Sequence, residues 1–140
     1  MIQKLTSLRK HWFTVLFLVL VLANVLIWRV IYRADRDILV VAFLNVGQGD
    51  AIYIEAPNGN QVLVDAGPGR QVLRELGRVM PFYDRSIDLV IATHPDADHI
   101  GGFPEVLERF AVGAVMEPGA TSDTAIYQAF RRAVSREASP

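Results

Sequence analysis

Four side chains of the types that bind metal ions lie within one stretch of six residues. They are His94, Asp96, Asp98 and His99, in the run Thr-His-Pro-Asp-Ala-Asp-His-Ile-Gly-Gly. Borderline and hard divalent ions accept imidazole nitrogen together with carboxylate oxygen, and close spacing lets one short loop supply several ligands. The stretch therefore predicts a metal site, and its ordinary alternative is a surface cap or ion pair. Gly101 and Gly102 are expected to let the backbone turn sharply beneath the site.

A calcium-binding loop is the nearest rival interpretation. Asp96 and Asp98 stand at the first and third positions of an EF-hand pattern, with Gly101 at the sixth. The twelfth position would be Leu107, where the pattern requires a bidentate glutamate. The EF-hand interpretation therefore fails.

The neighbouring sequence predicts the elements that hold these ligands. The apolar run at 87–92 indicates a buried strand and 103–110 indicates a helix, so we expect the four ligands on the loop between them. Two β-rich runs, 51–55 and 61–65, flank an Asn-Gly turn, which predicts a hairpin. Further predicted elements are a strand at 38–44, a helix at 69–79, a strand at 112–116 and a final helix capped by Ser122 or Asp123.

Three motifs in this order resemble those of the metallo-β-lactamase superfamily. The stretch at 94–102 is similar to the His-x-His-x-Asp-His signature, in the form typical of the domain attached to ComEC-type competence proteins of DNA uptake. The run at 45–51 resembles the Asp-Val-Gly-Gln-Gly-Asp-Ala motif of that subfamily. Leu-Val-Asp-Ala-Gly at 63–67 resembles the first motif of the superfamily. The resemblance covers about 38–129.

The resemblance implies an α/β (α+β) fold, with residues 38–140 forming the N-terminal half of an αββα sandwich. A complete sandwich packs each sheet against a second sheet on one face and helices on the other. Because this segment holds too few residues for both sheets, one sheet face should lack its partner. We therefore expect a fragment of a longer chain or a truncated product, completed by a missing C-terminal half or a second protomer.

The resemblance also implies roles for individual residues. The metal ligands would be His94, Asp96, Asp98 and His99. Asp98 would in addition orient the attacking water, which makes it the candidate catalytic residue. Asp65 would support the metal loop from beneath, whereas by itself it predicts only a strand-end turn leading into Gly67. The subfamily-motif candidates are Asn45, Gly47, Gln48, Gly49 and Asp50, with Asn45 in place of the usual aspartate.

The ligand set implied by the resemblance is incomplete in these 140 residues. Asp96 stands where the superfamily has histidine, which shifts the preference toward harder ions such as Mn²⁺ or Mg²⁺, with Zn²⁺ as the other expected ion. The chain has three histidines, and none follows His99. The more distant histidines and bridging aspartate that would complete a site for one or two ions are therefore absent from this sequence.

The expected activity is metal-assisted hydrolysis of a phosphodiester, with single-stranded DNA outside the membrane as the substrate that the resemblance implies. Arg70, Arg74 and Arg78 recur at helical spacing and are candidate phosphate contacts, although such a stripe is ordinarily a solvated helix face. A second basic cluster, Arg131, Arg132 and Arg136, lies in the last predicted helix. Two alternatives stay open: a non-catalytic membrane-anchored module that binds metal or a partner, and a small-molecule ester or lactam hydrolase.

The N-terminal region predicts a single membrane span. Residues 12–28 carry no charge, and we assign 1–11 as a basic tail, 12–32 as the transmembrane anchor and 33–37 as a linker. A cleaved signal peptide is the alternative, but no small-x-small cleavage site follows the apolar run.

The charge distribution predicts the orientation of that span. Basic residues precede it without any acidic residue, so the N-terminus is expected in the cytoplasm and the domain outside the cell membrane. All fifteen acidic residues lie from Asp35 onward, against nine arginines there, which leaves the domain about six units negative. The chain has no cysteine, which excludes disulfides and thiolate metal ligands and agrees with an oxidising exterior.

Overall fold

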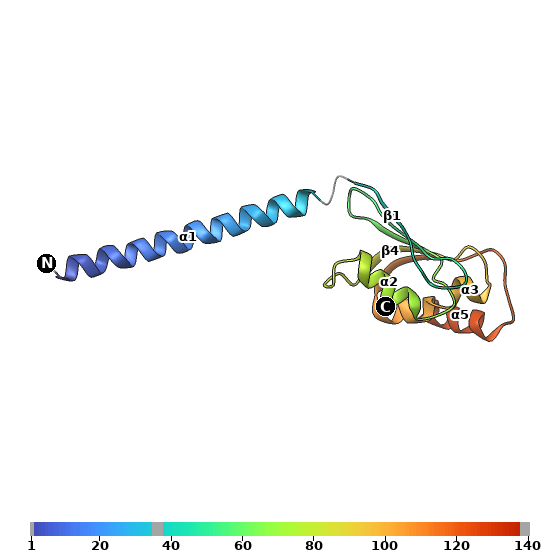
Figure 1. The fold of residues 1–140 in the computed structure, drawn as a ribbon. Helices are drawn as coiled ribbons and strands as arrows, with labels where there is room; N and C mark the ends of the chain where they lie inside the picture. The colour runs from blue at the N-terminus through green and yellow to red at the C-terminus, as the bar shows by residue number, and fades with distance from the viewer. Residues whose placement is uncertain (1, 35–37, 138–140) are drawn as a thin grey trace. The chain divides into compact units, whose positions relative to one another are not determined.

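The computed structural model describes residues 2–34 and 38–137, which belong to two compact units divided after Asp37. The first unit is one continuous helix, α1 (Ile2–Ala34) (Figure 1). Its segment His11–Arg29 has a mean hydropathy of 2.1 and no residue buried against other parts of the described chain. By length and composition this helix can cross a membrane, although a signal sequence passes the same test. Most of the predicted linker, 35–37, lies outside the described residues.

The second unit is built on one mixed sheet with strand order β1-β2-β3-β4-β5. The strands are β1 (Val40–Phe43), β2 (Ile52–Glu55), β3 (Gln61–Val64), β4 (Ser86–Ile91) and β5 (Ala111–Met116). The first three strands pair antiparallel, and β3, β4 and β5 pair parallel. Because parallel strands point the same way, β3, β4 and β5 deliver the residues that follow them to one edge of the sheet.

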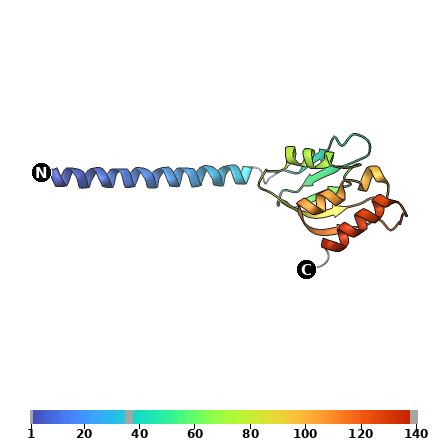
Figure 2. The same cartoon turned by 90° about the horizontal axis from the view of Figure 1, so that it is seen from below.

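Helices cover one face of this sheet (Figure 2). They are α2 (Gln71–Val79), α3 (Ala97–Ile100), α4 (Phe103–Arg109) and α5 (Ala125–Glu137). A single apolar core lies between them and the sheet, in which Leu63 of β3, Val90 of β4 and Phe130 of α5 are fully buried. The mixed α/β architecture with an N-terminal apolar helix confirms the predicted fold class.

The opposite face of the sheet carries apolar side chains that the described residues leave uncovered. Val41 and Phe43 of β1 alternate with the core-facing Ala42 and are 47% and 80% exposed. Met116 at the end of β5 is 54% exposed. A sheet that packs a layer on one side and leaves apolar residues on the other is what half of a four-layer sandwich requires.

Most predicted elements are present, among them the hairpin of β2 and β3, which turns through Gly59 with a φ of 87° that favours glycine. Two details differ from the prediction. The predicted cap of the last helix was wrong: α5 begins at Ala125, and the hydroxyl of Thr124, not a side chain at 122 or 123, accepts a hydrogen bond from the Tyr127 amide at 3.3 Å. The loop after β4 also contains a helical turn, α3, that was not predicted.

Candidate metal centre

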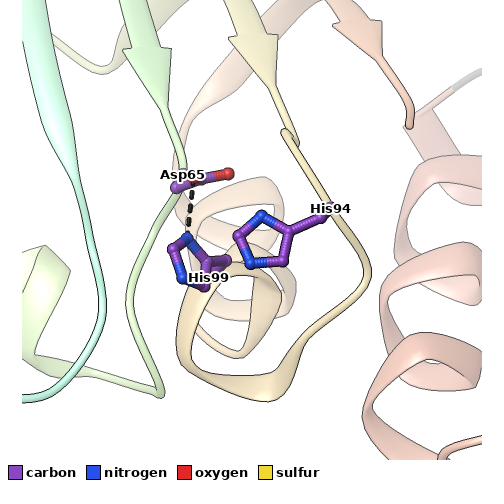
Figure 3. Close-up of side chains that lie close together, drawn as sticks. All are labelled: Asp65, His94 and His99. Carbon is purple, nitrogen blue, oxygen red and sulfur yellow. Dashed lines mark hydrogen bonds and ion pairs between the residues drawn. The ribbon is translucent and has the colours of Figure 1, made fainter.

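The candidate centre lies where the parallel strands end (Figure 3). Asp65 follows β3, His94 follows β4, and His99 belongs to α3. Strand pairing continues past the strand ends, since the Asp65 amide donates to the Ile91 carbonyl at 2.9 Å. This continuation brings residue 65 beside the loop at 93–94, although nearly thirty residues separate them in the chain.

Three side chains form a compact group with the composition of a metal site. Asp65, His94 and His99 each offer one ligand atom, and these atoms lie within 4.8 Å of one another. The two imidazole rings lie side by side with centroids 3.7 Å apart. The side chain of His94 is 42% exposed and that of His99 13% exposed, so the pair is reachable from solvent on the His94 side.

Asp65 is the buried anchor of the group. Its Oδ1 accepts a hydrogen bond from the Thr93 amide at 2.8 Å, and its Oδ2 accepts one from the Thr93 hydroxyl at 2.6 Å. Nδ1 of His99 lies 2.9 Å from the same Oδ2. With both oxygens engaged by the loop after β4 and by α3, Asp65 lies beneath the metal loop, where the resemblance places it, and its geometry suits a supporting group better than a direct ligand.

The two remaining predicted ligands lie on the other side of the imidazoles. Asp96 Oδ2 is 3.6 Å from Nε2 of His94, and Asp98 Oδ1 is 4.0 Å from Nε2 of His99. Their side chains are 70% and 36% exposed. Each of these carboxylates therefore lies near one of the two histidines but outside the compact group of Asp65, His94 and His99, with space between the carboxylate and the ring nitrogen. Their roles as ligands stay predictions.

Asp98 and His99 lie on a turn of helix instead of an extended loop. The amides of His99 and Ile100 both donate to the Asp96 carbonyl at 3.0 Å, and Ile100 is fully buried in the core. This turn aims the His99 ring toward Asp65 while Asp98 faces outward.

The subfamily-motif loop packs against this turn through its backbone. The backbone carbonyl of Asp98 lies so close to Gly49 that a Cβ there would stand 1.8 Å from its oxygen. The Gly67 amide donates to the Asp50 carbonyl at 2.9 Å, and Gly67 has a φ of 64°. Asn45, Gly47, Gln48 and Asp50 are exposed, so the loop meets the site chiefly through Gly49.

Gly101 and Gly102 are needed for a reason other than the expected one. Both have backbone angles of the right-handed helical region, with φ of −64° and −86°, which any residue adopts. A turn does lie at Gly101 and Gly102, as expected, but its backbone angles are not ones that only glycine adopts. A Cβ at Gly101 would stand 2.4 Å from the Pro68 carbonyl oxygen, and one at Gly102 would stand 2.2 Å from that of Ala66. The glycines allow the metal loop to lie directly on the segment that follows Asp65.

Thr93 is a residue of the site that sequence reasoning missed. Its hydroxyl lies 2.6 Å from Asp65 Oδ2 and 2.8 Å from Nδ1 of His94, so it contacts two members of the group at once. The available signal was a hydroxyl residue directly before the first histidine of the cluster.

The arginines of α2 are engaged by carboxylates. Arg70 donates to Glu105 at 3.1 Å, while Arg74 and Arg78 both donate to Glu75 at about 3 Å. The arginines themselves are 62–72% exposed, and Glu75 is 8% exposed. Their contact with phosphate stays a prediction, and a phosphate would compete with these carboxylates.

The Glu75 pairing predicts a specific acid sensitivity. Burial raises the pKa of Glu75, but the hydrogen bonds from Arg74 and Arg78 outweigh it and hold the pKa below the usual 4.5. A carboxyl whose pKa is lower in the folded state stabilises the fold above its unfolded pKa and loses this effect as the pH falls through the folded pKa. We expect the stability difference between the wild type and Glu75→Gln to be constant at neutral pH and to shrink below about pH 4.5 in urea unfolding. A difference that grows with acidity would contradict the assignment.

Arg131, one of the three arginines of the second basic cluster, borders a polar hollow next to the same sheet edge. Arg131 of α5 pairs with Glu117, the residue that follows β5. The hollow measures about 420 Å³, and its lining includes Ser122 and Asp123. Its mixed charge gives it no selectivity for anions.

Comparison with known proteins assigns the family. None of the curated proteins compared with this sequence matches it. The sequence model of the metallo-beta-lactamase superfamily matches residues 44–124, which is more than half of the chain. The matched region contains the subfamily-motif loop, Asp65 and the whole histidine–aspartate cluster. Proteins of this superfamily typically bind divalent metal ions and act as hydrolases, and this chain belongs to the metallo-β-lactamase superfamily.

Proposed function

We propose that this chain is the metal-binding half of a membrane-anchored hydrolase that cleaves phosphodiester bonds of single-stranded DNA in a ComEC-type DNA-uptake system. One observation carries the hydrolase part of the proposal. His94 and His99 stand side by side at the carboxyl edge of the sheet, Asp65 lies behind them, and a carboxylate lies near each Nε2.

The donor set of this group fits a divalent cation. Two imidazoles with two partly exposed carboxylates match the ligand types of Zn²⁺ and Mn²⁺, and the carboxylate of Asp96 in a position that the superfamily gives to histidine favours the harder ion. His94 and His99 would hold the cation through Nε2, and Asp96 and Asp98 through their carboxylates.

A divalent ion held there would lower the pKa of a bound water to about 7 and stabilise negative charge on a phosphoryl oxygen. The chain's own residues would then divide the remaining work. Asp98, which faces outward from α3, would accept a hydrogen bond from the attacking water and orient it. Asp65 would keep the His99 ring in place from the opposite side.

Single-stranded DNA is proposed as the substrate because of the resemblance to ComEC-type proteins and because of the proposed location of the domain outside the membrane. The Gly-Gln-Gly-Asp motif at 47–50 resembles that of ComEC-type proteins, and its Gly49 lies against the backbone of the proposed catalytic Asp98. The exposed arginine stripe of α2 would contact the phosphates of the strand. The apolar α1, with basic residues before it, would anchor the chain in the cell membrane and leave the domain outside.

A second candidate function is a module that binds metal without turnover. It is favoured by the histidine count, because two of the three histidines form the described site and the third, His11, belongs to α1. Under the hydrolase proposal the remaining ligands come from a further segment or from a second copy of the chain.

The test combines metal content with cleavage. The full chain in detergent is loaded with Mn²⁺ or Zn²⁺, and bound metal and hydrolysis of a single-stranded oligonucleotide are measured. Asp98→Ala is expected to lower turnover at least about 100-fold, because the residue holds both the cation and the water, and His99→Ala is expected to remove both metal and turnover. Glu108→Ala removes an exposed carboxylate of α4 away from the cluster and serves as the matched control.

Each outcome narrows the alternatives. Turnover in the wild type would mean that a second copy of the chain completes the site. Stoichiometric metal without turnover would leave the non-catalytic module or a hydrolase completed by a further segment. Turnover of an ester or lactam but not of DNA would favour the small-molecule hydrolase. Turnover that survives Asp98→Ala unchanged would remove Asp98 from the mechanism.

A further inference from the structure

The hydroxyl of Thr93 connects Asp65 to His94. Its Oγ1 lies 2.6 Å from Asp65 Oδ2 and 2.8 Å from Nδ1 of His94. His99 reaches the same Oδ2 directly, with its Nδ1 at 2.9 Å. One buried carboxylate oxygen is therefore joined to both imidazoles, to one directly and to the other through a hydroxyl.

The direction of each hydrogen bond follows from the chemistry of the groups. A carboxylate only accepts, so Oδ2 of Asp65 must receive a hydrogen from the Thr93 hydroxyl and another from Nδ1 of His99. A hydroxyl has one hydrogen to donate and lone pairs to accept with. Once the hydrogen of Thr93 points to Asp65, the oxygen can only accept from His94, and the hydrogen of that bond must lie on Nδ1 of His94.

We infer that Thr93 is a positioning residue that fixes His94 in the tautomer with hydrogen on Nδ1, so that Nε2 of both histidines presents a lone pair to the same cation. This inference rests on the metal site of the proposed function but not on hydrolysis. A histidine that binds metal commonly donates its other ring N–H to a carboxylate or a carbonyl. For His94, the Thr93 hydroxyl takes the place of that carboxylate or carbonyl.

The surroundings of His94 explain why its tautomer depends on this one bond. Its side chain is 42% exposed, and its other near neighbours are the His99 ring and Asp96. Asp96 Oδ2 is 3.6 Å from Nε2, which is too long for a hydrogen bond. Without the hydroxyl, this carboxylate would compete to draw the hydrogen onto Nε2 and so block the atom that has to bind metal.

The test compares two substitutions in the full chain. Thr93→Val keeps the shape and the backbone amide that donates to Asp65 Oδ1 but removes the hydroxyl, whereas Thr93→Ser keeps the hydroxyl. Long-range ¹H–¹⁵N correlation spectra at neutral pH report which ring nitrogen of each histidine carries hydrogen. Titration with Zn²⁺ reports affinity, and neither readout needs turnover.

We expect hydrogen on Nδ1 of both histidines in the wild type and in Thr93→Ser. In Thr93→Val we expect His94 to become a mixture of tautomers while His99 is unchanged, because His99 bonds to Asp65 directly. Zn²⁺ affinity should fall about 10- to 100-fold in Thr93→Val and by less than about threefold in Thr93→Ser.

Two results would overturn the inference: hydrogen on Nε2 of His94 in the wild type, or a Thr93→Val chain with the wild-type tautomer and affinity. The wild-type spectrum decides the first without any variant, so misfolding of Thr93→Val cannot hide the answer. Failure of the wild type to bind Zn²⁺ or Mn²⁺ would count against the proposed function, while the assignment of the tautomers would still be decided by the spectra.

Discussion

Asp65→Ala is expected to lower the free energy of unfolding by about 3 to 5 kcal/mol and to lower metal affinity about 10- to 100-fold. Asp65 is 3% exposed, and its carboxylate accepts from the Thr93 amide, the Thr93 hydroxyl and His99. Each buried donor left without an acceptor costs about 1 to 3 kcal/mol. Alanine would also have to adopt the left-handed φ of 55°, at a further cost of about 1 to 2 kcal/mol. Urea unfolding followed by circular dichroism measures the change.

Asp65→Asn separates the charge of this side chain from its backbone conformation. Asparagine accepts left-handed φ angles and keeps one oxygen for the Thr93 amide, so it should restore part of the stability lost in Asp65→Ala. Its amide hydrogens would face Nδ1 of His99 and push the ring hydrogen onto Nε2, so metal affinity should stay low. Wild-type metal affinity in Asp65→Asn would show that the carboxylate does not orient His99.

Gly49→Ala is the second substitution with a large expected effect, a loss of about 3 kcal/mol or more. Two causes act together. The φ of 86° is unfavourable for alanine by about 1 to 2 kcal/mol, and the added Cβ would stand 1.8 Å from the Asp98 carbonyl oxygen. Backbone on both sides of this contact must shift, and overpacking of this kind costs about 1 to 3 kcal/mol. Because the displaced carbonyl belongs to Asp98, metal affinity should fall together with stability.

Two other glycines provide matched controls for the same unfolding measurement. Gly59 has a nearly identical φ of 87° but open space around it, so Gly59→Ala measures the conformational cost alone. Gly77 lies exposed in α2 with nothing near its Cβ position, and Gly77→Ala should stabilise the helix by about 0.5 to 1 kcal/mol. If Gly49→Ala and Gly59→Ala lower the free energy of unfolding equally, the loop around Gly49 can shift without cost and its contact with Asp98 contributes nothing.

The sequence predicted those elements whose local signals agree with their tertiary surroundings. The Asn-Gly turn at 58–59 joins two alternating strands, and β2 and β3 pair there as expected. The apolar run of β4 followed by polar ligands indicated a strand ending at a functional edge, and the cluster lies at that edge. Asp65 could be placed near the cluster only through the resemblance, because nothing in its local sequence relates it to residues 93–99.

The features that escaped prediction depend on distances between segments far apart in the chain. The helical turn α3 has four residues, which is too few for propensity to decide, and it is held by burial of Ile100. From the sequence, Gly101 and Gly102 indicated only a turn. Their close contact with the carbonyls of residues 66 and 68 could not be predicted, because those residues lie far away in the chain. The role of Thr93 could not be predicted, because it depends on which groups its hydroxyl contacts, and these are known only from the folded structure.

The candidate centre is assembled from three separate parts of the chain, so the fraction of the domain that is folded should depend on the free metal concentration. Asp65 holds the His99 ring in place only when β3, β4 and α3 are assembled, so an ion that needs this arrangement binds the folded chain more tightly than the unfolded one. Binding of this kind adds about 2.7 kcal/mol to stability when the free ion is at 100 times its Kd. The lifetime of this domain against proteases would then follow the free metal concentration around it, even where no substrate is present.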